Sequence, residues 1–274
     1  MSVIYTAEKR NSFSPPKSSF LHLVRNNAYF LLVSLMIFSY FYNLPVVGYS
    51  VKGDNELRLY DLLGLIILIL FYGNFKFYYY VIKKVPPLKW LYWFILWSSF
   101  TIISTLLFAI FRDKMAVFYQ SVLYLYHLWV FFVTSVFLYV ISFDKYKLKL
   151  FIIIVFILSS ASCLIIALQN FNIIPFLWSD NYYKGYRGFL SGTLGPNKIV
   201  SGMFSLINLI FAIGVFYNKK IKISKILTIF VIIINVYVLL LSGSRTSYLG
   251  LLVFLLFFSF FVSLHFRFKI NLTP

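Results

Sequence analysis

The sequence predicts an all-α protein, a polytopic bundle of transmembrane helices. Of its 274 residues, 61% are hydrophobic and 22% aromatic, whereas only 12% are charged. The mean hydropathy is +0.88. Unbroken apolar runs of roughly 20 residues, each long enough to cross a bilayer as a helix, recur along the whole chain. These observations exclude a soluble globular class.

The apolar runs predict about eight spans, at residues 28–48, 59–75, 90–111, 117–142, 150–169, 197–217, 226–242 and 246–266. The last two lie in one long apolar stretch. They are predicted as two helices, because a single helix of that length would exceed the thickness of the hydrocarbon core about twofold. A tight turn at Ser242, Gly243 and Ser244 separates them. The polar residues 1–27 do not resemble a cleaved signal peptide, so we expect a cytoplasmic tail before a single transmembrane domain, 28–274.

The distribution of basic residues predicts the orientation. With the N-terminus inside, the inner segments hold 17 of the 25 Lys and Arg and 2 of the 7 acids, a net +15. The outer segments hold the other 8 and 5, a net +3. The positive-inside rule therefore predicts that both termini lie inside. Because the positive charge lies in short loops between spans, it does not indicate a nucleic-acid partner. The sequence also predicts no metal and no cofactor.

The longest outer segment, 170–196, carries the first candidate ligand, Arg187. Gly192 and Gly195 follow it and allow the backbone to approach a ligand closely. Asn197 is a helix-start signal, and Lys198 comes directly after it. A guanidinium beside a helix N-terminus is a binding site for phosphate. The alternative for Arg187 is a loop that only connects two spans, with the arginine contacting lipid headgroups. The alternative for Lys198 is a lysine whose side chain extends to the membrane interface.

Arg245 is the second candidate ligand, and it follows Ser244 in LLLSGSRTSYLG. It lies in the first turn of the last span, where the helix dipole disfavours a cation. A cation in this position requires an anionic partner, which we expect to be a bound diphosphate. The alternative is an ion pair with one of the outer acids, namely Asp54, Glu56, Asp61, Asp113 and Asp180.

The remaining ionisable residues favour structural roles. We expect Asp61 to pair with Arg58 or another outer arginine. His127 lies in the middle of a span among aromatic residues, and we expect packing with a hydrogen bond to a tyrosine rather than a functional role. Asp180 is the only acid of the long outer loop and so the only local candidate base. Cys163, the single cysteine, is expected to be a packing residue. The catalytic residue stays unknown.

Two segments resemble the O-antigen ligase and O-antigen polymerase superfamily of bacterial envelope enzymes. RGFLSGTLGPNKIVSG (187–202) is similar to the block that precedes a span in that family, and LLLSGSRTSYLGLLV (239–253) to its Ser-Arg block at a span start. LRLYDLLGLIIL (57–68) more weakly resembles the second span of that family. The motifs cover about thirty residues, and their order and spacing carry the resemblance.

The resemblance implies a membrane glycosyltransferase in the bacterial cytoplasmic (inner) membrane that polymerises oligosaccharide repeat units for O-antigen, capsule or exopolysaccharide. Its substrate would be a glycan linked to polyprenyl diphosphate. The diphosphate would be held by Arg187, Arg245 and Lys198, with Gly192, Gly195, Asn197 and Ser244 as supporting residues. Membrane lipid, a flippase and a chain-length regulator are the implied partners.

The chain departs from the family in one respect. Family members usually continue to ten or more spans and often carry a catalytic histidine in a later external loop, whereas this sequence ends at NLTP with no outer histidine. We therefore expect a truncated chain. The alternatives to a polymerase are a ligase that transfers the glycan to lipid A core, a non-enzymatic component of a glycolipid exporter, and an inactive fragment.

Overall fold

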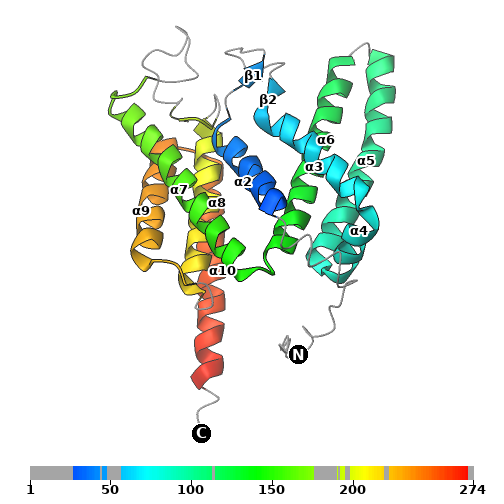
Figure 1. Cartoon of the computed structure of the whole chain (residues 1–274). Helices are drawn as coiled ribbons and strands as arrows, with labels where there is room; N and C mark the ends of the chain where they lie inside the picture. The colour runs from blue at the N-terminus through cyan, green and yellow to red at the C-terminus, as the bar shows by residue number, and fades with distance from the viewer. Residues whose placement is uncertain are drawn as a thin grey trace. The chain divides into compact units, whose positions relative to one another are not determined.

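The computed structural model describes residues 27–43, 45–47, 57–112, 115–175, 190, 192–194, 198–218 and 222–270. The described residues form two compact units. Unit 1 comprises residues 27–36 and 61–148, and unit 2 comprises residues 37–60 and 149–270. Most of them are helical (Figure 1), which confirms the all-α class.

The described residues form nine helices and one two-stranded sheet. The helices are α2 (Asn27–Phe41), α3 (Leu59–Gly73), α4 (Phe75–Lys84), α5 (Pro86–Arg112), α6 (Met115–Ile141), α7 (Lys145–Asn170), α8 (Lys198–Tyr217), α9 (Lys225–Ser242) and α10 (Arg245–Ile270). The strands β1 (Pro45–Val47) and β2 (Leu57–Arg58) pair antiparallel. Five helices, α5 to α9, are long and apolar enough to cross a membrane, and α3 with α4 makes a sixth if this bent pair is one span.

Two predictions about the first half of the chain were wrong in detail. The predicted span 28–48 ends early, because α2 stops at Phe41 and β1 begins at Pro45. Proline lacks the backbone N–H that a continuing helix would donate. The predicted inner connection after residue 75 contains helix α4, which is bent by 89° from α3. The other predicted spans agree with the helices within a few residues.

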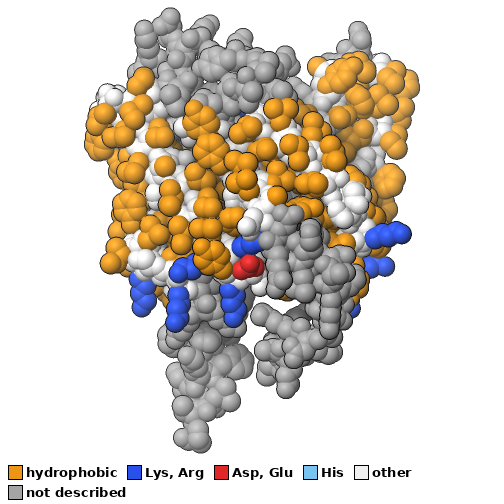
Figure 2. All heavy atoms as spheres, viewed as in Figure 1, with side chains coloured by type: hydrophobic (Ala, Val, Ile, Leu, Met, Phe, Trp, Pro, Cys, Tyr) orange, Lys and Arg blue, Asp and Glu red, His pale blue; other side chains and the backbone are white. Residues whose placement is uncertain are grey.

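Unit 1 is held together by aromatic packing around α4. Helix α5 packs along α6, and α4 packs against both. Tyr78 of α4 is 1% exposed and stacks between two rings, at 5.3 Å from Phe71 of α3 and 4.9 Å from Phe137 of α6. Apolar side chains cover most of the visible described surface (Figure 2), as expected for helices that face lipid.

Unit 2 is built around α8, which packs against α9 and α10. A buried polar contact joins α7 to α9, where the Asn235 amide donates to Ser159 Oγ at 3.1 Å and accepts from Cys163 Sγ at 3.5 Å. Side-chain hydrogen bonds of this kind hold helices together in an apolar surrounding. Cys163 is fully buried in a cluster with Ile166 and Val238, so its prediction as a packing residue is confirmed.

Candidate functional site

Arg245 begins helix α10 directly after a tight turn, as the sequence predicted. Helix α9 ends at Ser242, and Gly243 has the left-handed φ of 57° that reverses the chain. The Ser244 hydroxyl accepts from the Ser247 N–H at 3.4 Å, which makes Ser244 the N-cap of α10. Arg245 itself is exposed, whereas Ser244 and Ser247 are buried. Ser244 therefore has a structural role as a helix cap, and its predicted supporting role at a diphosphate site stays a prediction.

The first turn of α8 lies against this turn. A Cβ atom added at Gly202 would lie 2.6 Å from the hydroxyls of both Ser242 and Ser247 and 2.9 Å from Ser244 Cβ. Only glycine allows this approach, because real Cβ atoms are essentially never found so close to other atoms. The two segments singled out in the sequence, 187–202 and 239–253, therefore meet in unit 2. They bring together the N-terminal ends of α8 and α10.

A second turn, Gly192–Leu194, lies four residues before α8 and is fixed by side chains from distant elements. Gly192 has a φ of 58°, and its N–H donates to Gln169 Oε1 of α7 at 3.0 Å. The Thr193 hydroxyl donates to the Phe41 carbonyl at 2.7 Å, and Asn43 donates to the Leu194 carbonyl at 3.0 Å. The turn is buried, so these bonds satisfy groups that water cannot reach.

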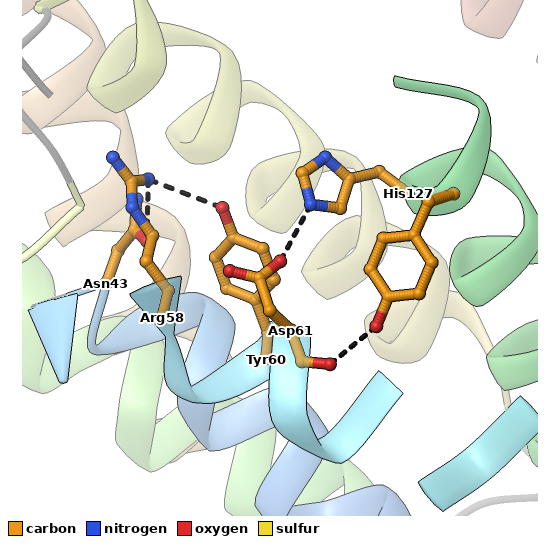
Figure 3. Close-up of polar contacts among 6 residues, drawn as sticks. Asn43, Arg58, Tyr60, Asp61 and His127 are labelled. Atoms are coloured by element: carbon orange, nitrogen blue, oxygen red, sulfur yellow. Dashed lines mark hydrogen bonds and ion pairs between the residues drawn. The ribbon is translucent and has the colours of Figure 1, made fainter. Parts of the chain in front are cut away.

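Two further contacts connect this turn to its surroundings. Arg58 of β2 donates to Asn43 Oδ1 at 2.9 Å (Figure 3), which fixes the amide that holds Leu194. Ser201 of α8 donates to the Leu190 carbonyl at 3.0 Å. Sequence reasoning missed Asn43 and Gln169 as supporting residues, because neither residue lies in a recognisable motif.

Part of the predicted site lies outside the described residues. Arg187, Gly195 and Asn197 belong to this part, and so do the acids Asp54, Glu56, Asp113 and Asp180. Lys198 is the first residue of α8, and the position of its side chain is not described. Arg245, Ser244 and Gly192 are therefore the predicted site residues whose surroundings the structure describes.

Unit 1 contains a separate polar contact inside the apolar bundle. His127 Nε2 of α6 lies 2.8 Å from Asp61 Oδ1 in the first turn of α3 (Figure 3), and the Asp61 side chain is 12% exposed. The Tyr126 hydroxyl donates to the Asp61 carbonyl oxygen. The sequence did not predict this carboxylate–imidazole pair: it predicted an arginine partner for Asp61 and a tyrosine partner for His127.

A close approach of α3 to α6 makes this pair possible. A Cβ atom added at Gly64 would lie 2.6 Å from the Tyr126 hydroxyl and 2.8 Å from Val130 Cγ2. Gly64 lies one turn after Asp61, on the same face of α3. The sequence contained one signal for this contact, since an ionisable residue in the middle of a span requires a polar partner.

Chemically, the turns of unit 2 are suited to an anion. The first N–H groups of a helix have no partner within that helix and carry a partial positive charge. Two helices, α8 and α10, begin next to each other, and one of them begins with an exposed arginine. Among the described residues, no group of three or more His, Cys, Asp or Glu lies close enough to hold a metal ion.

Comparison of the chain with protein-family models, with curated proteins and with solved structures found no match.

Proposed function

We propose that this protein is a membrane glycosyltransferase that polymerises oligosaccharide repeat units carried on polyprenyl diphosphate. One observation carries the proposal: the two segments whose sequences resemble the O-antigen polymerase and ligase superfamily meet where Gly202 contacts Ser242 and Ser247. Without this contact, the resemblance would rest on two short and weak motifs. Because of this contact, the two motifs lie next to each other at one end of unit 2.

The proposed topology has eight spans, with both termini on the cytoplasmic side of the bacterial inner membrane. Helices α8 and α10 then both begin at the outer face. The net charge of +15 for the predicted inner segments against +3 for the outer ones supports this orientation.

In the proposed reaction, an acceptor hydroxyl of one repeat unit attacks the anomeric carbon of the glycan on the carrier. The bond from that carbon to the diphosphate oxygen breaks, and the diphosphate leaves with the electron pair. Arg245, together with Arg187 and Lys198, would stabilise the charge that develops on the leaving group. Arginine suits this task because its fork of N–H donors matches phosphate oxygens. The group that accepts the hydroxyl proton is not assigned.

Complementation tests this proposal. In cells that lack their own polymerase, the intact chain should restore long glycans, and Arg245→Ala or Arg187→Ala should remove them at unchanged protein level. Arg112→Ala is the matched control, because Arg112 is also exposed and predicted to be outside but lies in neither motif. Long glycans that persist in both motif variants would refute the diphosphate role. In cells that lack their own ligase instead, transfer of glycan to lipid A core would indicate a ligase.

A further inference from the structure

Helix α4 differs from the other helices of unit 1 in length and direction. It follows α3 after Asn74 and is bent by 89° from it. Its ten residues extend about 15 Å, which is half of the roughly 30 Å hydrocarbon core. Helix α4 cannot cross a bilayer by itself. If α3 runs along the membrane normal, then α4 runs close to the membrane plane.

The two faces of α4 have opposite chemistry. Tyr78, Val81 and Ile82 are buried. Lys76, Lys83 and Lys84 are exposed. At the α4 end of unit 1, the space-filling view shows Lys and Arg side chains projecting beyond the apolar surface (Figure 2). An amphipathic helix with aromatic residues and with lysines on its polar face is typical of segments that lie in the membrane interface.

The lysine ammonium groups are held at aromatic rings. Lys83 Nζ lies 4.8 Å from the centre of the Tyr79 ring, and Lys84 Nζ lies 5.5 Å from the centre of the Tyr80 ring. Tyrosine prefers the headgroup level of a bilayer, so these contacts keep the charges at that depth. The sequence has no Asp or Glu between residues 62 and 112, so acidic partners near in sequence are missing. Among the described residues, these three lysines form no ion pair.

We infer that the lysine face of α4 binds the phosphate groups of anionic phospholipids in the membrane that holds the protein. The partner follows from charge, because three ammonium groups on one short helix complement a surface of anionic headgroups. The buried face of Tyr78, Val81 and Ile82 anchors the helix to α5 and α6, so the lysines are presented on a rigid support. This inference does not depend on the proposed enzymatic activity.

Lipid competition around the full-length protein tests the inference. The chain is reconstituted in vesicles of phosphatidylcholine with a minority of phosphatidylglycerol, and one of the two lipids is brominated so that it quenches tryptophan fluorescence. Trp90, near the start of α5, is 75% exposed, and it reports on lipid close to α4 once the other four of the five tryptophans are replaced by phenylalanine in every protein compared. We expect phosphatidylglycerol to be enriched there. A lysine near an anionic surface contributes about fivefold to association. In the K76Q/K83Q/K84Q variant, the association constant of phosphatidylglycerol relative to phosphatidylcholine should therefore be lower by about fivefold or more.

Two controls separate a site on α4 from net positive charge. K145Q/K149Q/K225Q removes the same charge from exposed lysines of other helices and should keep the preference. K76R/K83R/K84R keeps the charge on α4 and should also keep the preference, even if the glutamine variant fails to insert. High salt should remove the preference of the unmodified protein, because the screening length falls to about 3 Å at 1 M. No preference in the unmodified protein, or equal losses in the two glutamine variants, would overturn the inference.

Discussion

Two turns of unit 2 contain a glycine with nearly the same left-handed backbone but are stabilised in opposite ways. Gly192 has a φ of 58° and Gly243 a φ of 57°. Gly192 is buried, and a Cβ added to it would lie 2.8 Å from Ile166 Cγ1, whereas a Cβ on Gly243 would meet nothing within 4 Å. The first turn therefore requires glycine for both space and conformation, and the second for conformation alone.

The contacts that hold the two turns differ in range. The turn at Gly243 is held by its neighbours, with the Ser242 hydroxyl accepting from the Ser244 N–H at 3.3 Å. The turn at Gly192 depends on Gln169, which is 23 residues away, and on Asn43, which lies 151 residues before Leu194. This difference indicates that the start of α10 is encoded locally, whereas the turn before α8 forms only when distant parts of unit 2 have assembled.

The largest effect is expected for Gly192→Ala. A residue with a side chain pays about 1–2 kcal/mol for the left-handed conformation. The clash with Ile166 adds about 1–3 kcal/mol. We therefore expect the free energy of unfolding in detergent micelles to fall by about 2–5 kcal/mol. Gly214→Ala is the control, because Gly214 lies in α8 with open space around it. This variant should be slightly more stable than the unmodified protein, since alanine favours a helix more than glycine does.

A smaller loss is expected for Gln169→Met, which keeps the volume of the side chain but removes the acceptor for the Gly192 N–H and the donor to the Pro175 carbonyl. A buried donor that loses its acceptor costs about 1–3 kcal/mol. The neighbouring Asn170→Leu, which removes only a 3.4 Å contact to Tyr237, should cost less. Equal thermal shifts for the two variants would show that the turn does not depend on Gln169.

Gly243→Ala should destabilise the protein by about 1–2 kcal/mol, since only the conformational term applies. Gly243→Asn should cost less, because asparagine tolerates the left-handed region. Measured beside Gly192→Ala under the same conditions, this pair tests the comparison directly. A loss at Gly243 as large as that at Gly192 would contradict it.

The smallest effect on stability is expected for Arg245→Ala. The side chain is exposed, and exposed substitutions usually change stability by less than about 0.5 kcal/mol. Arg58→Ala should be more destabilising, because Arg58 holds Asn43 and through it the Leu194 carbonyl. If the proposed function is correct, Arg245→Ala combines full stability with the loss of long glycans.

The sequence was sufficient to predict what is determined locally. The apolar runs predicted the main helices within a few residues, and the Ser-Gly-Ser signal predicted the turn before Arg245. Asn43 and Gln169 could not be predicted, because an amide that bonds to a distant carbonyl or N–H leaves no periodic signal. The pair of Asp61 and His127 was missed for the same reason, since 66 residues separate them. Helix α4 was assigned to a loop, because it is too short for a span.

The distance in sequence between Asp61 and His127 also affects how the chain is made. Translation proceeds from the N-terminus at about 5–20 residues per second, so α3 leaves the ribosome about 3–13 seconds before the imidazole that pairs with its carboxylate. During this interval, α3 carries Asp61 without the α6 contact. Final docking of α3 in unit 1 must therefore follow the membrane insertion of α6, so the carboxylate–imidazole contact forms after α3 itself has been inserted.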